Sequence, residues 1–234
     1  DNIYSRGPHF YIYVVMYFGA ILYLSASTVI TAREFQNRSR LLIYPLILFV
    51  MAETIIQVAL PELHVTWLCV TLLSVLYFIY CSEMWNQLDA LTGLLNQNSY
   101  LKQTGGVRCK GGVLVVFDVD DFKQINDRYG HIQGDLCLAG IAECIKKSYA
   151  NFGYCYRIGG DEFCVLLKNG GNEGRCKQEF LQRLQEKRGE IAFLPTVSYG
   201  SAPFSGEDIV KVKDRADQDM YQYKKERKNR KRLS

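Results

Sequence analysis

The sequence predicts an α+β domain that follows a transmembrane α-helical region. The composition of the 234-residue chain changes near residue 83, because the part before it is almost continuously apolar and the part after it carries charges and glycines at the density of a globular domain. In the second part, runs of β-forming residues alternate with amphipathic stretches of helical spacing. We therefore expect a membrane region over residues 1–82, a helical linker over 83–88 and a folded domain over 89–234.

Three apolar stretches in the first part are long enough to cross a bilayer, since about 20 apolar residues make one span. They cover Phe10–Ala32, Leu41–Leu60 and about Val65–Ser82. The loop Arg33–Arg40 carries three arginines, whereas the loop after the second stretch has no Lys or Arg. The positive-inside rule places the arginine loop and the chain after the third stretch in the cytoplasm. The sequence thus predicts a multi-pass membrane protein with a cytoplasmic domain.

An acidic residue lies inside the second apolar stretch. Glu53, with Gln57 one turn later, is a candidate functional group for ligand sensing. The alternative is a hydrogen bond to a neighbouring helix or to a span upstream, since the chain starts at Asp1 without Met and is expected to be the end of a longer membrane protein. Cys81–Leu88 contains no Pro or Gly, so a continuous helix is expected to lead toward Asp89.

The cysteines favour a reduced setting for the folded domain. The chain has eight of them, with no C-x-x-C pair and no metal-ligand spacing. Six lie in the polar part of the chain. A disulfide framework and a zinc site are therefore not indicated, and a cytosolic location is the simpler interpretation.

The folded domain begins with helix signals and then a buried strand. Asp89 or Thr92 can cap a helix, and Asn98 or Ser99 can start the next one. The apolar run Val113–Phe117 predicts a buried strand, which delivers the carboxylate that follows it, Asp118, to an exposed end.

A hairpin is predicted over Tyr154–Leu167, where two β-forming runs flank Gly159 and Gly160. A glycine pair tolerates the positive φ angles of a tight turn. Asp161 and Glu162 follow directly, so two acids stand at the hairpin tip. By itself this pattern is equally well explained as a surface turn. With the second acid-bearing stretch upstream, it indicates a site for a divalent metal and a nucleotide.

Further helices and one further strand complete the domain. The sequence predicts amphipathic helices over Leu136–Ser148 and Cys176–Lys187, a strand over Thr196–Gly200 and a last helix over Asp214–Lys224. In the last helix, Ala216, Met220 and Tyr223 fall on one face, which is expected to pack inward.

These stretches together resemble the GGDEF family of diguanylate cyclases, over residues 89–234. The matching motifs, in order and spacing, are Asp89-Ala-Leu-Thr-Gly-Leu-Leu-Asn96, the stretch Val113 to Asp135, the hairpin Gly-Gly-Asp-Glu-Phe, Thr196-Val-Ser-Tyr-Gly200 and Asp214 to Lys224. The resemblance implies a palm fold, with a central antiparallel sheet and surrounding helices as in nucleotidyl cyclases. It implies the condensation of two GTP into cyclic di-GMP and two pyrophosphates by an antiparallel homodimer. With the apolar first part, it implies a protein of the bacterial inner membrane.

The resemblance also implies the metal and catalytic residues. The Asp118 carboxylate and the Val119 carbonyl are expected to hold Mg²⁺, with Mn²⁺ as an alternative, because hard oxygen ligands suit such ions. Asp161 and Glu162 are expected to complete this site. One of the two acids accepts the proton of the attacking 3′-hydroxyl, and we assign this role to Asp161, with either acid able to bind metal.

Substrate contacts follow from the resemblance in the same way. Guanine is expected to be recognised by Asn126 and Asp135, which from their own pattern would be a helix cap and a surface acid. An amide and a carboxylate match the guanine edge and leave adenine with unmatched polar groups. The phosphates are expected to lie against Phe122, Lys123, Gly159, Gly160, Lys224 and Lys228. His131 is expected to be structural.

The sequence departs from the family pattern at several positions. Gln97 replaces an Arg, Arg227 replaces a Gly and Lys228 replaces an Arg. An inhibitory Arg-x-x-Asp site would need Arg at Ala150 and Asp at Gly153, so no inhibitory site is predicted.

The expected partners are GTP, a second copy of the chain and membrane lipid, with no nucleic acid. The basic tail Lys224–Arg232 could bind anionic lipid or be a solvated tail. Three alternatives to the cyclase remain: a catalytically weak domain that acts as a GTP-binding or cyclic di-GMP receptor, a cyclase with a different dinucleotide product, and a membrane interaction protein.

Overall fold

The computed structural model describes residues 66–105, 111–168 and 170–233, together with isolated residues between 12 and 56. The chain divides into two compact units, residues 1–86 and 87–234. The first unit contains helix α3 (Thr66–Trp85). The second unit contains, in order, α4 (Gln97–Thr104), β1 (Gly112–Val119), α5 (Phe122–Tyr129), α6 (His131–Tyr149), β2 (Gly153–Arg157), β3 (Glu162–Leu167), the short 3₁₀ helix η2 (Gly170–Asn172), α7 (Glu173–Glu190), β4 (Val197–Phe204) and α8 (Ile209–Leu233).

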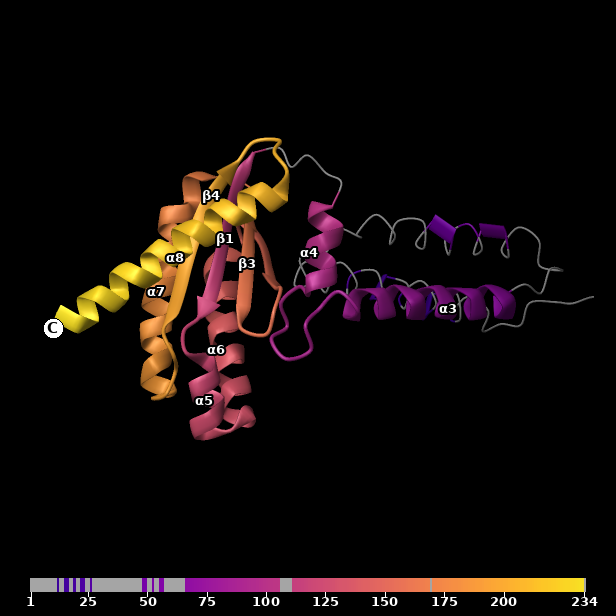
Figure 1. Cartoon of the computed structure of the whole chain (residues 1–234). Coiled ribbons are helices and arrows are strands. Elements are labelled where there is room, and N and C mark those ends of the chain that lie inside the picture. The colour runs from indigo at the N-terminus through magenta and orange to yellow at the C-terminus, as the bar shows by residue number, and fades with distance from the viewer. Residues whose placement is uncertain are drawn as a thin grey trace, which may run out of the picture. The chain divides into compact units, whose positions relative to one another are not determined.

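The strands that the described residues of the second unit form make one antiparallel sheet in the order β2-β3-β1-β4 (Figure 1). β1 pairs with β3 on one side and with β4 on the other. The predicted run Val113–Phe117 lies within β1, and the predicted hairpin is β2 and β3. The expected α+β domain with a central antiparallel sheet and surrounding helices is therefore confirmed.

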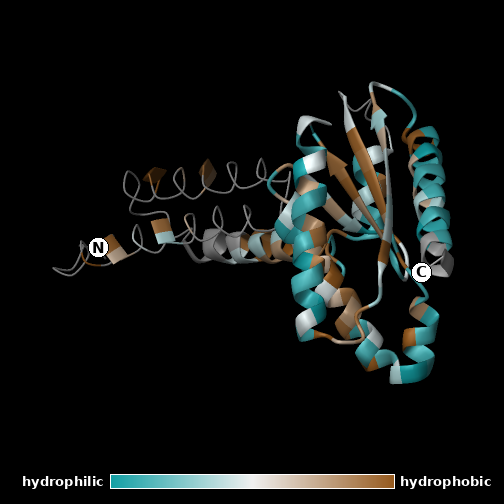
Figure 2. Cartoon of the chain, turned by 90° about the vertical axis from the view of Figure 1, so that its left-hand side faces the viewer, coloured by the Kyte–Doolittle hydropathy of each residue, from teal (hydrophilic) through white to brown (hydrophobic). Residues whose placement is uncertain are grey.

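Strand β1 is buried on both faces, because helices cover both sides of the sheet. Side chains alternate along a strand, so Val115 and Phe117 pack toward α6 and α7, whereas Leu114 and Val116 pack toward α8 and α4. A strand buried on both faces has a nearly continuous apolar sequence, which explains why the run is visible in the sequence. Figure 2 shows hydrophobic strands flanked by helices with largely hydrophilic outer surfaces.

Other parts of the second unit cover both edges of this sheet. At β4, the Ser201 N–H donates to Asp219 of α8 at 2.9 Å, and Arg215 of α8 donates to the Pro203 carbonyl at 2.7 Å. At β2, the backbone of Leu95 forms a parallel bridge to the strand. At both edges, some backbone groups of the edge strands thus have partners within the same chain.

The close packing of α8 on β4 depends on a glycine at position 200. A Cβ at Gly200 would lie 2.2 Å from the Ala216 carbonyl oxygen and 2.2 Å from the Met220 nitrogen. Both obstacles are backbone atoms, so a side chain at this position would force the helix and the strand apart.

We expect Gly200→Ala to destabilise the protein by about 1–3 kcal/mol, the range for overpacked cores, as measured by urea unfolding. Gly189→Ala is the matched control, because Gly189 lies in α7 with nothing within 4 Å of its added Cβ. In a helix this control is expected to be neutral or to stabilise by up to about 1 kcal/mol. Equal unfolding midpoints for the two variants would contradict the packing argument.

Several elements differ from the sequence prediction at their ends. α6 begins at His131 rather than Leu136, because Gly130, with a φ of 86°, joins it directly to α5. α5 is a short polar helix that the apolar pattern does not indicate. The residue that caps α4 is Asn96, whose side chain accepts the Ser99 N–H at 3.0 Å.

The predicted membrane location is wrong, because none of the helices formed by described residues has the length and apolar character to cross a membrane. The third expected span corresponds to α3, which is 20 residues long and carries the polar Ser82 and Glu83 near its end. Its uninterrupted apolar part is therefore shorter than the about 20 residues of a typical span. The first two expected spans, with Glu53 and Gln57, lie outside the described residues apart from isolated positions. The multi-pass inner-membrane assignment and the lipid partner consequently have no support.

Candidate active site

The carboxylates predicted from two separate stretches meet at one end of the sheet. Asp118, near the end of β1, is the pairing partner of Glu162, the first residue of β3. The Val119 N–H donates to the Asp161 carbonyl at 3.2 Å. β1 therefore ends where β3 begins, and this antiparallel register brings together Asp118, Val119, Asp161 and Glu162.

The hairpin turn is wider than the sequence indicated. Four residues, Ile158 to Asp161, separate the end of β2 from the start of β3. Gly159 and Gly160 both lie in this turn, and neither has a positive φ angle. The expectation of a tight turn that requires positive φ was wrong, because four residues can reverse the chain without it.

Arg157, which the sequence analysis did not single out, fastens this turn to the start of the domain. Its guanidinium donates to the Gly160 carbonyl at 2.8 and 3.3 Å and to the Asp89 carboxylate at 3.0 Å. Asp89 also accepts the Thr92 N–H and hydroxyl, at 2.9 and 2.6 Å. Partial burial raises the pKa of Asp89, but the hydrogen bonds from Thr92 and Arg157 leave it below its ordinary value. The sequence feature that could have indicated this role is the position of an Arg directly before the turn that contains the two glycines.

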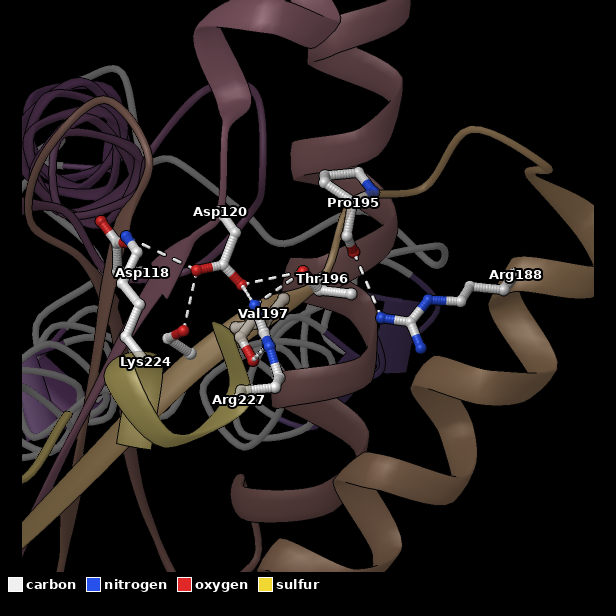
Figure 3. Close-up of polar contacts among 9 residues, drawn as sticks. Asp118, Asp120, Arg188, Pro195, Thr196, Val197, Lys224 and Arg227 are labelled. Carbon is white, nitrogen blue, oxygen red and sulfur yellow. Dashed lines mark hydrogen bonds and ion pairs between the residues drawn. The ribbon is translucent and has the colours of Figure 1, made fainter. Parts of the chain in front are cut away.

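A lysine of the last helix reaches the end of β1. The ammonium of Lys224 on α8 forms an ion pair with Asp118 and lies 3.5 Å from the Asp120 carboxylate (Figure 3). Burial lowers the pKa of Lys224, but the two carboxylates leave it above its ordinary value. In the described ranges, no three or more His, Cys, Asp or Glu side chains gather closely enough to hold a metal ion. The Asp118 carboxylate is instead paired with an amine.

Asp120 is a second residue that sequence reasoning missed. Its side chain is 3% exposed, and it accepts hydrogen bonds from the Thr196 and Ser198 hydroxyls at 2.9 and 2.8 Å and from Arg227 (Figure 3). Burial raises the pKa of this carboxyl, but these donors leave it below its ordinary value. The sequence signal was a pair of hydroxyl residues two positions apart, Thr196 directly before β4 and Ser198 within it.

Arg227, which stands where the family pattern has a Gly, has several hydrogen-bond partners. Besides Asp120, its guanidinium donates to the Thr196 hydroxyl at 2.9 Å and to the Val197 carbonyl at 3.2 Å. Lys228 follows it in α8, and its side chain lies outside the described part of the structure.

The residues predicted to recognise guanine lie on α5 and α6. The Asn126 Oδ1 is buried, and no described atom hydrogen-bonds to it. A Cβ at Gly134 would lie 1.9 Å from this oxygen, so the two helices meet closely here. Asp135 follows Gly134 and is exposed.

The remaining residues named from the sequence lie at the starts of helices. Phe122 and Lys123 begin α5, directly after Asp121, which has a φ of 53°. Phe122 packs partly against the core, and Lys123 is exposed. His131 begins α6 and is exposed, and Gln97 begins α4.

Comparison with known proteins gives a consistent result. A family model described as "Diguanylate cyclase, GGDEF domain" matches residues 86–230, more than half of the chain. The probable diguanylate cyclase DgcJ of Escherichia coli is 30% identical over 151 residues, which cover 61% of this chain and 30% of that protein. The diguanylate cyclase DgcS of Shewanella oneidensis is 32% identical over 154 residues, which cover 62% of this chain and 52% of that protein. The chain thus spans about half, or less, of these relatives' own length.

A solved structure supports the same fold. The coiled coil and GGDEF domain of DgcB from Caulobacter crescentus, in complex with c-di-GMP, matches with a TM-score of 0.54. The match covers 68% of this chain and 93% of that chain at 24% identity.

Proposed function

The chain belongs to the GGDEF family of diguanylate cyclases, and from this premise we propose that it condenses two GTP into cyclic di-GMP and two pyrophosphates. The observation that carries the proposal is the pairing of Asp118 with Glu162, beside the hydrogen bond from Val119 to Asp161. This register gathers acids that are distant in sequence at one sheet end, as a nucleotidyl-transfer site requires.

Carboxylate and carbonyl oxygens at this end fit a divalent metal by their chemistry. Asp118, the Val119 carbonyl, Asp161 and Glu162 offer hard oxygen ligands, which suit Mg²⁺, with Mn²⁺ as an alternative. When bound, such an ion neutralises negative charge on the phosphates. The ion pair between Lys224 and Asp118 supports this assignment, because it indicates that the Asp118 carboxylate attracts a cation.

The reaction needs a base and a positioned triphosphate. Asp161 accepts the proton of the 3′-hydroxyl, whose oxygen forms a bond to the α-phosphorus of the other GTP while pyrophosphate leaves. Glu162 serves as the second acid of the site. The chain holds the triphosphate with Lys123, Lys224 and Lys228 and with the backbone of Phe122, Gly159 and Gly160.

Guanine recognition is assigned to Asn126 and Asp135. The packing of the Asn126 side chain against Gly134, the neighbour of Asp135, supports the assignment, because it places both residues at one junction of α5 and α6. Adenine lacks the N–H that guanine has at the corresponding ring position, so it would leave an acceptor of this pair unmatched.

One site holds one GTP, and the product needs two bonds between two nucleotides. Two copies of the chain therefore face each other in antiparallel orientation, so that each 3′-hydroxyl reaches the other nucleotide's α-phosphorus.

The test is the conversion of labelled GTP by the chain at high concentration, with and without Mg²⁺, beside labelled ATP. We expect cyclic di-GMP and pyrophosphate from GTP alone, and no product after removal of the metal by a chelator. Tight binding of GTP without product would favour the receptor alternative. A product that incorporates both nucleotides from a mixture would contradict the guanine assignment.

A related prediction concerns product inhibition. The positions of the inhibitory Arg-x-x-Asp motif hold Ala150 and Gly153. A Cβ at Gly153 would lie 2.4 Å from the Leu166 carbonyl oxygen, which leaves no room for an Asp side chain. We expect added cyclic di-GMP to leave the initial rate within about twofold, since no charged contact is available to bind it there. Noncompetitive inhibition by the product would contradict this.

A further inference from the structure

In the second half of α8, the guanidinium of Arg227 contacts the end of the sheet. Arg227 donates to the Thr196 hydroxyl and the Val197 carbonyl at the start of β4, and to the buried carboxylate of Asp120 just after β1. The Asp120 N–H also donates to the Thr196 carbonyl at 2.8 Å, so the two strands are joined here by their backbones. Arg227 therefore contacts the place where the end of β1 and the start of β4 are hydrogen-bonded to each other.

Lys224 lies on the same face of α8 as Arg227 and contacts the same carboxylate, that of Asp120. Residues three apart on a helix are neighbours, and both side chains extend from α8 toward the end of β1 (Figure 3). The two oxygens of Asp120 are divided between them. Oδ2 accepts from Arg227, while Oδ1 accepts from Ser198 and lies 3.5 Å from the Lys224 ammonium. The Lys224 ammonium, which also pairs with Asp118, and the Arg227 guanidinium thus both contact the Asp120 carboxylate.

We propose that Arg227 is a positioning residue that sets Lys224 for the substrate triphosphate by fixing Asp120 and the end of α8. This inference rests on the proposed function, in which Lys224 binds phosphate. Arg227 itself does not touch the substrate, because its guanidinium is engaged with Asp120, Thr196 and Val197.

The helix does not need Arg227 to dock on the sheet. Earlier in α8, Ala216 and Met220 pack against Gly200, Asp219 accepts the Ser201 N–H, and the rings of Tyr223 and Tyr199 lie 4.5 Å apart. Loss of Arg227 is therefore expected to free the part of the helix from Lys224 onward, with the rest still packed.

A double-mutant cycle on nucleotide affinity tests this relation in the full chain. The probe is a GTP analogue with a methylene group between the α- and β-phosphorus, which cannot react, and its binding in Mg²⁺ is measured by calorimetry. The proteins are the parent, Arg227→Ala, Lys224→Ala and the double variant. Arg227→Lys keeps the charge, and Arg215→Ala removes an arginine at the start of the same helix, where it pairs with Glu207.

Lys224→Ala is expected to weaken binding about 10-fold or more, as for loss of a charged hydrogen bond. Arg227→Ala is expected to weaken it about 5- to 10-fold, and the double variant to equal Lys224→Ala within about twofold, because one residue acts through the other. Arg227→Lys should recover most of the affinity, and Arg215→Ala should leave it unchanged.

Other results would overturn the inference. Additive losses in the double variant, or a lower melting temperature of Arg227→Ala with unchanged affinity, would leave Arg227 a purely structural role. If Arg227→Ala does not fold, the same cycle with Arg227→Gln decides between these outcomes. A parent chain that does not bind the analogue would overturn the proposed function and this inference together, whereas the first two results overturn the inference alone.

Discussion

Asp161→Asn is expected to abolish cyclic di-GMP formation, with a loss in turnover of at least about 10²-fold. The amide keeps the shape of the side chain but cannot accept the 3′-hydroxyl proton, and general base catalysis contributes about 10²–10⁴-fold. It also removes one negative charge from the proposed metal site. The backbone carbonyl of Asp161, which accepts the Val119 N–H, stays in place, so the turn should keep its structure.

Turnover of labelled GTP by the variant should be measured beside binding of the unreactive GTP analogue. We expect affinity to fall far less than turnover, because the guanine and phosphate contacts come from other residues. Asp214→Asn is the matched control, since Asp214 is an exposed acid on α8. Turnover of Asp161→Asn within about threefold of the parent would contradict the assignment of this residue as the base.

Asp120→Ala is expected to lower the free energy of unfolding by about 3–5 kcal/mol, the usual cost of removing one partner of a buried ion pair. The carboxylate is 3% exposed, and without it the guanidinium of Arg227 and the hydroxyls of Thr196 and Ser198 lose an acceptor. The two hydroxyls can turn to other acceptors, whereas the guanidinium keeps its charge in a partly buried position.

Urea unfolding of the full chain, followed by the far-UV circular dichroism of its helices, measures this effect. Asp120→Asn keeps an acceptor oxygen and should lose less than Asp120→Ala. Asp214→Ala removes an exposed acid and should stay within about 0.5 kcal/mol of the parent, as most surface changes do. If Asp120→Ala were as stable as Asp214→Ala, the network around Asp120 would have no net role in folding.

The parts of the fold that follow from local pattern were predictable. The run Val113–Phe117 is buried on both faces and therefore reads as apolar throughout. The hairpin strands carry β-forming residues, and the helices that pack on the sheet show apolar spacing. The pairing of β1 with β4 joins distant segments, and no local pattern reports it.

The membrane prediction failed for a related reason. An apolar stretch reports that side chains avoid water, and it does not by itself report what covers them. The predicted span Val65–Ser82 corresponds to α3. Ser82 and Glu83 near the end of this helix shorten its apolar part.

The candidate site was predictable in part. A strand that ends in Asp118 and a turn followed by Asp161 and Glu162 indicate an acidic site from the residues alone. Asn126 and Asp135 could be placed only by resemblance, because their own pattern is that of a cap and a surface acid. The interaction of Asp120 with Arg227 was not predicted, since it depends on a contact between the end of β1 and the last helix.

The covered edges of the sheet have a consequence for how this domain avoids unwanted self-association. Exposed edge strands are templates for intermolecular β-pairing, which leads to fibrillar aggregates. Here Asp219 and Arg215 occupy backbone groups of β4, Pro203 removes one donor from the same strand, and Leu95 bridges β2. These contacts occupy positions at which a second copy of the domain would otherwise pair, so they hinder continuous sheet growth between copies.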